Sequence, residues 1–173
     1  MKYYLILLTA IILIGESCKV AATTRIFVVR HADRTPAPAD DLIPADVIRA
    51  DELKRVLLNA GVDSIFSTNF VRTKKTVQPL ANAKNLQIIL YPNTQSLLNR
   101  ILTNSKGKTV LVAGHSDNVP EIITQCGCTP PFNEIPDSQF DNLFLIIIQK
   151  EKINGTVSSS CKLIRMRYGA ITN

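Results

Sequence analysis

The sequence predicts a three-layer α/β/α sandwich with a mostly parallel central sheet. Three unbroken apolar segments, each bounded by polar or turn residues, support this fold class: residues 25–29, 109–114 and 143–148. Short apolar runs rich in Val and Ile are typical of strands buried on both faces of a parallel sheet. Helical patterns alternate with these strands, which favours helices packed on both faces of one sheet.

Weaker strand candidates complete the sheet. They lie at 64–66 and 87–91 and in the C-terminal segment 158–168. The last segment does not alternate cleanly between apolar and polar residues, so we expect it towards an edge of the sheet.

The first helix is predicted over 44–61. Pro44 suits the first turn of a helix, and Gly61 suits the cap after its last turn. Its expected apolar stripe follows helical spacing and consists of Val47, Ala50, Leu53, Leu57 and Ala60.

Three further helices are expected. The second covers 69–84, where Pro79 should kink or end it. The third covers 93–107, and a short fourth helix follows Asn118.

The N-terminal segment 1–17 is predicted to be a signal peptide. It carries one Lys and then an apolar run that is shorter than the roughly 20 residues of a bilayer span. Cleavage before Cys18 would leave a lipid-bearing Cys18 as the first residue of a lipoprotein. Cleavage after Ala22 and retention as an uncleaved anchor are the alternatives.

Residues 18–23 are then a short linker, and 24–173 form a single domain. We expect this domain to be exported to the periplasm or outer envelope, and to be held at the membrane if Cys18 is lipidated.

The net charge of +6 persists without residues 1–17, because Lys2 and Glu16 cancel. A basic exported domain is suited to nucleic acid, anionic lipid or small anions. The Lys and Arg residues are spread out and Trp is absent, which argues against nucleic acid and favours small anions.

The cysteines suggest a disulfide. With Cys18 lipidated, three thiols remain, and an oxidising compartment permits a bond from Cys161 to either Cys126 or Cys128. A zinc site is not expected, because the chain has only two histidines and no second close-spaced Cys pair.

Both histidines directly follow a strong strand. His31 ends the first apolar segment and His115 ends the second. Ligands of such sheets bind beyond the carboxyl ends of the strands, so we expect both histidines in one site. Arg30 and Arg34 flank His31, and Arg72 falls in the first turn of a predicted helix, whose amides would add an anion site.

These residue types suit a phosphoryl group. Arginine forks match its oxygens, and a neutral histidine nitrogen attacks phosphorus to form a covalent intermediate. Catalysis of phosphoryl transfer is mostly positioning and electrostatic stabilisation.

Three motifs resemble those of the histidine phosphatase superfamily, also called phosphoglycerate-mutase-like. Residues 30–36, "RHADRTP", match the family's Arg-His-Gly-x-Arg-x-Pro at all but the Gly. Ala at that position is common in the small phosphohistidine-phosphatase-like branch. Arg72 before a Thr is similar to the middle motif, and Gly114-His115-Ser116 is similar to the late one. The resemblance spans about residues 24–168.

The resemblance implies a phosphoric monoester hydrolase of the histidine acid phosphatase type. It makes His31 the phosphorylated nucleophile, with Arg30, Arg72 and His115 completing the phosphate pocket. Arg34 would join them through the longer motif. It implies no metal and no other cofactor.

The sequence departs from the family pattern at the residue that should act as the general acid. One branch keeps a carboxylate between the middle Arg and the second His, but residues 73–116 contain no Asp or Glu. The other branch uses the residue after the second His, which here is Ser116. The remaining candidates are Asp117, one position late, Asp33 inside the first motif and Glu121 in the following turn, and the absence of any general acid is the competing alternative.

The expected function is an exported phosphatase that hydrolyses a phosphomonoester or another phosphoryl compound through phosphohistidine on His31. The substrate would be a small molecule or a phosphoprotein. The alternatives are a phosphotransferase or mutase on the same site, and a non-catalytic, membrane-tethered domain that binds a phospho-ligand.

Overall fold

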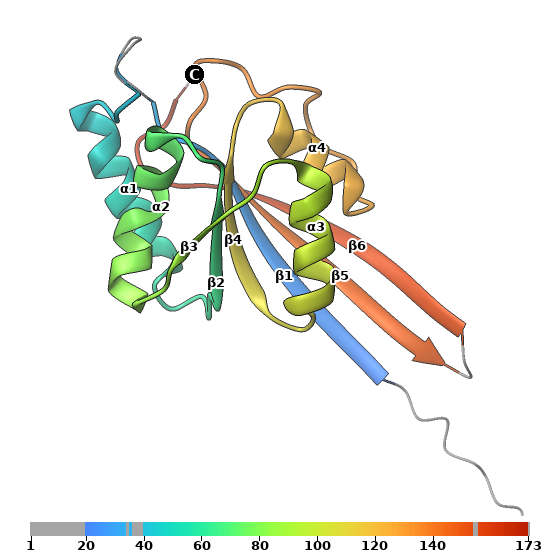
Figure 1. The fold of residues 1–173 in the computed structure, drawn as a ribbon. Helices are drawn as coiled ribbons and strands as arrows, with labels where there is room; N and C mark the ends of the chain where they lie inside the picture. The colour runs from blue at the N-terminus through green and yellow to red at the C-terminus, as the bar shows by residue number, and fades with distance from the viewer. Residues whose placement is uncertain (1–19, 34, 36–39, 154–155, 173) are drawn as a thin grey trace, which may run out of the picture.

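The computed structural model describes residues 20–33, 35, 40–153 and 156–172. Six strands and four helices alternate over most of this part of the chain (Figure 1). In chain order they are β1 (Val20–Arg30), α1 (Pro44–Leu57), β2 (Ser64–Ser67), α2 (Val71–Lys84), β3 (Ile88–Leu90), α3 (Thr94–Asn104), β4 (Thr109–Gly114), α4 (Asn118–Gln125), β5 (Asn142–Ile153) and β6 (Thr156–Arg167).

The sheet has the order β3-β2-β4-β1-β5-β6 and is mostly parallel, as the sequence predicts. The first four strands of that order run parallel, whereas β5 is antiparallel to β1 and β6 is antiparallel to β5. The expected edge position of the C-terminal strand is confirmed.

The apolar segment 143–148 was predicted to be a parallel strand, and this detail is wrong. The chain after α4 returns to the end of the sheet where β1 finishes, so Leu143 pairs with Val29. From that starting point β5 runs back along β1 in the opposite direction.

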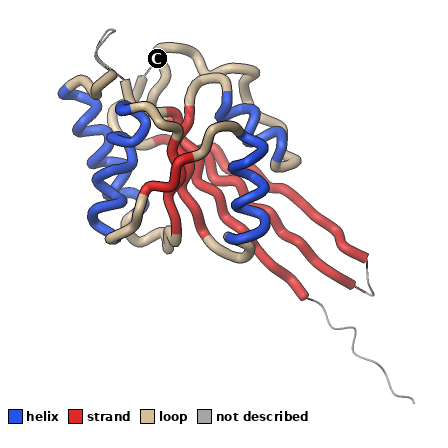
Figure 2. The backbone as a smooth tube through the Cα atoms, viewed as in Figure 1, coloured by secondary structure: helices blue, strands red, loops and turns tan. Residues whose placement is uncertain are grey.

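Helices cover both faces of the sheet, which confirms the three-layer sandwich. Figure 2 shows α1 and α2 on one side of the strands and α3 and α4 on the other. Alternate residues of the strands feed two cores: Ile26 and Val28 pack with α3 and α4, and Phe27 and Val29 pack with α1 and α2. The strands are therefore apolar on both faces, which explains their unbroken apolar sequence.

The buried stripe of α1 differs from the prediction. Val47 is exposed, whereas Asp46 and Arg49 are buried. Arg49 donates to Asp46 Oδ1 at 2.8 Å and to the carbonyl of Ala170 at 2.8 Å. Arg49 thereby connects α1 to the C-terminal segment, and the buried face of the helix holds this ion pair while Val47 lies outside it.

One helix boundary was also predicted wrongly. The first helix ends at Leu57, and Gly61 lies in the following turn with φ of +70°, a backbone conformation that glycine adopts without strain. The second helix does end at Lys84, the predicted position, with Asn85 in the left-handed conformation after it, so Pro79 lies inside α2 and does not end it. The first turn of α2 does contain Arg72, as predicted.

Strand β1 begins at Val20, ahead of the expected start at Thr24, so the last part of the proposed 18–23 linker is strand. The proposed signal peptide 1–17 and Cys18 lie outside the described residues. None of the helices in the described part of the chain has the length and apolar character that a bilayer span requires.

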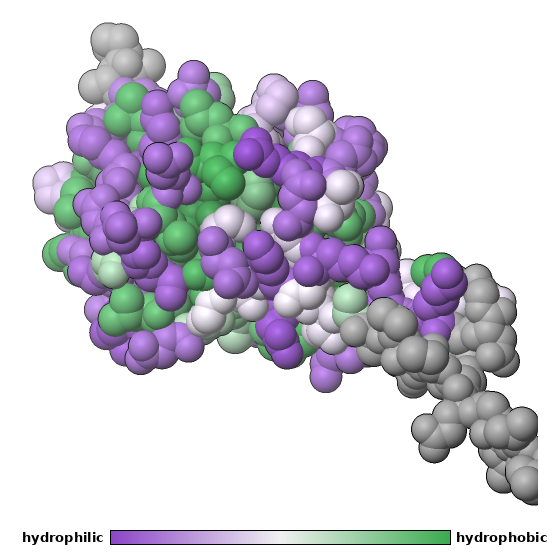
Figure 3. Space-filling model, turned by 60° about the horizontal axis from the view of Figure 1, so that its bottom comes forward, coloured by the Kyte–Doolittle hydropathy of each residue, from purple (hydrophilic) through white to green (hydrophobic). Residues whose placement is uncertain are grey.

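The surface at the end opposite the carboxyl ends of the parallel strands is mostly hydrophilic (Figure 3). Hydrophobic residues are more frequent there towards the side of α1 and α2. The exposed large hydrophobic residues among the described residues include four of α1 or the residue after it, Val47, Ile48, Val56 and Leu58.

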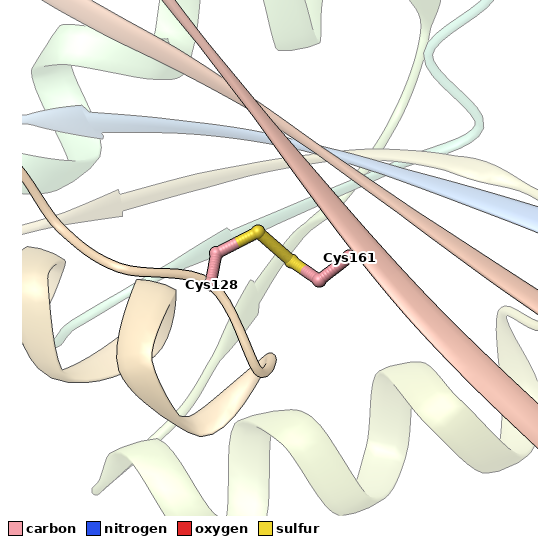
Figure 4. The surroundings of a disulfide bond; sticks show 2 residues. All are labelled: Cys128 and Cys161. Carbon is pink, nitrogen blue, oxygen red and sulfur yellow. A yellow bond between two sulfur atoms is a disulfide. The ribbon is translucent and has the colours of Figure 1, made fainter.

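A disulfide joins Cys128, in the segment after α4, to Cys161 on β6 (Figure 4). Their Cα atoms are 5.5 Å apart. This pairing resolves the choice that the sequence left between Cys126 and Cys128. Cys126 is half-buried and free, and burial raises the pKa of its thiol to about 12.

We predict that Cys128→Ser lowers the free energy of unfolding by about 3 to 4 kcal/mol, because the bond closes a loop between residues 33 apart in the sequence. Urea unfolding followed by circular dichroism measures the change. Cys126→Ser is the matched control and should keep the wild-type sensitivity to reductant. Equal loss of stability in both variants would contradict the assignment of the bond.

Candidate active site

The register of β1 and β4 brings the two histidines together. Arg30 pairs with Gly114, so the next residue of each strand leaves the sheet at the same point. The amide of His31 donates to the carbonyl of Gly114 at 2.9 Å, and the two imidazole ring centres are 5.2 Å apart. The sequence-based expectation of one shared site is therefore met by His31 and His115.

Gly114 is glycine because another side chain fills the space beside its Cα. A Cβ at this position would overlap Asn118 Oδ1, which accepts a hydrogen bond from the His115 amide at 2.7 Å. The hydroxyl of Tyr91 lies on the same side and donates to the carbonyl of Ala113 at 2.9 Å. These contacts hold the backbone of His115 at the start of α4.

The contacts of His31 fix its tautomer. Nδ1 lies 2.7 Å from the carbonyl oxygen of Ala32, and a carbonyl only accepts, so Nδ1 carries the proton. Nε2 then keeps a lone pair, which accepts a hydrogen bond from Arg72 Nε at 3.1 Å. An unprotonated Nε2 is the form of histidine that acts as a nucleophile.

Burial keeps His31 neutral. Its side chain is 6% exposed, and loss of solvation lowers its pKa from 6.5 to about 3. The hydrogen bond to Ala32 opposes this shift, while Arg72 and His115 add to it. Burial, with the nearby charge of Arg72 adding to it, therefore preserves the Nε2 lone pair across the physiological pH range.

His115 is held by groups from the end of β2 and the start of α2. Its Nε2 lies 2.8 Å from Thr68 Oγ1, and its ring meets Phe70 edge-on with the ring centres 5.0 Å apart. Burial first, and then the charge of Arg72, lowers the pKa of His115.

The N-terminus of α2 already carries an anion. Asp40 accepts from the amide of Val71 at 2.8 Å and forms an ion pair with Arg72. These contacts outweigh the burial of Asp40, so its pKa is lowered. The helix-terminal anion site predicted from the sequence is thus present, and a carboxylate of the same chain occupies it.

Arg30 is buried and points towards the segment that precedes β5. Its Nη1 donates to the carbonyls of Pro136 at 2.8 Å and Asp137 at 3.0 Å, and its Nη2 lies 3.3 Å from Asp137 Oδ1. The guanidinium carbon lies 4.3 Å from the ring centre of Phe140. Nε is buried without a hydrogen-bond partner among the described residues.

Arg30, His31, Arg72 and His115 line a pocket of about 720 Å³, a volume within the usual range of small-molecule sites. Asp33 and Asp117 also line it, as the sequence predicts for acid candidates. Asp117 Oδ1 accepts from the amide of Asn118 at 2.7 Å and caps α4. Neither acid has a tested role, so both stay predictions, and Arg34 lies outside the described residues.

The sequence offers the segment 126–140, with Glu134 and Asp137, for the pocket rim but does not place either acid, and it gives no sign of Phe70. Glu134, Asp137 and Phe140 come from one long segment between α4 and β5, and Phe70 precedes α2. The signal for Glu134 and Asp137 was their position in that segment, which follows the second histidine motif. Among the described residues, no three His, Cys, Asp or Glu side chains gather as a metal site would require.

Solved structures with this fold are known, although no family model and no curated relative matches the sequence. A proposed phosphohistidine phosphatase, SixA, from Agrobacterium tumefaciens is 17% identical, with a TM-score of 0.58 over 84% of this chain and 99% of that one. The mycobacterial glucosyl-3-phosphoglycerate phosphatase is 10% identical, with a TM-score of 0.58 over 82% and 98%. Phosphoglycerate mutase from Plasmodium falciparum is 15% identical, with a TM-score of 0.50 over 87% and 93%.

The chain has the histidine phosphatase fold. Within that fold, the suspected nucleophile and its neighbours meet at the carboxyl ends of β1 and β4, where the three sequence motifs placed them.

We predict that His31 makes the fold acid-sensitive. Its pKa is about 3 when folded and near 6.5 when unfolded, so the unfolded state binds the extra proton between these values. Stability should fall as pH drops through this window. From about pH 7 to about pH 4, wild type should lose on the order of 3 kcal/mol more than His31→Asn.

Urea unfolding of both proteins across that pH range measures the difference. Parallel stability curves for wild type and His31→Asn would show that burial does not hold the imidazole neutral.

We also predict that Asp40→Asn tightens the binding of inorganic phosphate by about five- to tenfold, because it removes the carboxylate that competes for Arg72. Isothermal titration calorimetry measures the dissociation constant. Asp41→Asn is the matched control, since Asp41 pairs with the exposed Lys75. Weaker binding in Asp40→Asn would mean instead that Asp40 orients Arg72 for phosphate.

Proposed function

We propose that the protein is a phosphatase that forms phosphohistidine on His31. The observation that supports this most directly is the state of His31: a buried, neutral imidazole whose Nε2 lone pair faces Arg72 in an open pocket. A group that only bound phosphate would need donors there, whereas this nitrogen is an acceptor and a nucleophile.

The reaction takes two displacements. Nε2 of His31 attacks phosphorus while Arg72 and Arg30 bind the non-bridging oxygens, and the leaving group departs on the far side. His115, hydrogen-bonded to Thr68, faces the same phosphoryl group and donates to it when protonated. Water then attacks the phosphohistidine and releases inorganic phosphate, restoring neutral His31.

The substrate is proposed to be a phosphomonoester or another phosphoryl compound, on a small molecule or a phosphoprotein. A phosphatase is preferred to a phosphotransferase or mutase because the compact chain leaves little room for an insertion that would exclude water. Arg34 is proposed to add a further phosphate contact, as the longer family motif implies.

Export is proposed from two features. The apolar N-terminal segment has the length and flanks of an export signal, and the Cys128–Cys161 disulfide suits an oxidising compartment. The enzyme is therefore proposed to reside in the periplasm or outer envelope, and to be anchored to the membrane through Cys18 if that residue is lipidated.

The decisive experiment replaces the nucleophile. Phosphate release from p-nitrophenyl phosphate and from a phosphohistidine donor should fall by at least about 10³-fold in His31→Ala. Rapid quench of wild type with labelled donor should trap one phosphoryl group on His31. Gln95→Ala, at an exposed site on α3, is the control and should keep full activity.

Turnover of neither donor by wild type would contradict the phosphatase and favour a binding domain. Full activity in His31→Ala would show that another group attacks phosphorus.

A further inference from the structure

The proposed attack fixes where the leaving group must lie. In-line transfer puts the leaving oxygen on the side of phosphorus opposite His31 Nε2. Because His31 is buried at the inner end of the pocket, that side faces the pocket mouth. An acid that protonates the leaving group must therefore come from the rim.

Four carboxyl groups among the described residues line this pocket, and two are committed to cationic or dipolar partners. Asp137 forms an ion pair with Arg30, and its side chain is 97% exposed. Asp117 caps α4, where the helix dipole stabilises a negative charge. Both carboxyl groups therefore already have a structural partner, Arg30 for Asp137 and the start of α4 for Asp117.

Glu134 has a different kind of partner. Its Oε1 accepts from the hydroxyl of Ser116 at 2.9 Å, and no ion pair joins it to a cation in the described part of the chain. The hydrogen bond engages one oxygen and leaves the other carboxyl oxygen open towards a leaving group. Ser116 directly follows His115, so the Glu134 carboxyl lies beside a residue that is proposed to bind the phosphoryl group.

The residues that follow Glu134 are anchored by burial and by hydrogen bonds, although the glutamate itself is exposed. The next residue, Ile135, is buried in the core, and its amide donates to the carbonyl of Ser116 at 3.0 Å. Arg30 binds the carbonyls of Pro136 and Asp137 that follow. Such anchoring gives the carboxyl a defined position at the rim, as a group that transfers protons requires.

We propose that Glu134 is the general acid of the first displacement and the general base of the second. This inference rests on the proposed phosphohistidine chemistry. As the His31 Nε2–P bond forms and the P–O bond breaks, the proton on Glu134 moves to the ester oxygen and the alcohol leaves. The carboxylate then takes a proton from the attacking water, and phosphate departs from His31.

The test compares two leaving groups. Glu134→Gln should lower kcat/KM for glycerol 2-phosphate by about 10²-fold or more, because an alkoxide leaves poorly without a proton. For p-nitrophenyl phosphate, whose phenolate leaves well, the loss should stay under about threefold. Ser116→Ala should produce a smaller loss of about tenfold, again confined to glycerol 2-phosphate.

Three variants serve as comparisons. Glu52→Gln, on α1 outside the pocket, should keep wild-type rates on both donors. Asp117→Asn and Asp33→Asn test the rival acids. A selective loss on glycerol 2-phosphate in either of these, with Glu134→Gln unaffected, would overturn the assignment of Glu134.

Equal loss on both donors in Glu134→Gln would also overturn it, because that result indicates a role in binding or folding. Failure of the underlying chemistry gives a different result: wild type would then hydrolyse neither donor and His31 would trap no phosphoryl group.

Discussion

The parallel pairing of β1 with β4 is the constraint on which the pocket depends. Because Arg30 lies opposite Gly114, the chain leaves both strands at the same level and sets His31 against His115. Hydrogen bonds along the two buried strands fix this register. A shift by one residue would turn every apolar side chain to the other face of the sheet, so the two cores and the site are specified by the same pairing.

Charge is graded from the inner end of the pocket to its mouth. The inner end holds Arg30, Arg72 and the two imidazoles. Burial lowers the pKa values of both imidazoles, so the positive charge at this end is carried by the guanidinium groups. The carboxylates lie at the rim or, in the case of Asp40, over the start of α2. A phosphoryl dianion would replace water and carboxylate beside the guanidinium groups, with the neutral nucleophile behind it.

Much of this arrangement could be predicted from local sequence patterns. Apolar runs located the central strands, and polar residues at their ends located Arg30, His31 and His115. The position of Arg72 followed from the helix start after β2. Local rules were less reliable where tertiary contacts compete with them. On α1 the buried face holds the Asp46–Arg49 ion pair, whereas the predicted core residue Val47 is exposed.

By itself, then, the sequence determined the layered sheet and the inner half of the pocket, because strand periodicity and strand ends are encoded within a few neighbouring residues. Only the tertiary structure decided the pairing of Cys128 with Cys161, the Asp40 contact at α2 and the position of Glu134 beside Ser116. Each of these depends on a segment without regular periodicity that closes against a distant part of the chain. Contacts of that kind follow from packing and hydrogen bonding in three dimensions, which no local pattern records.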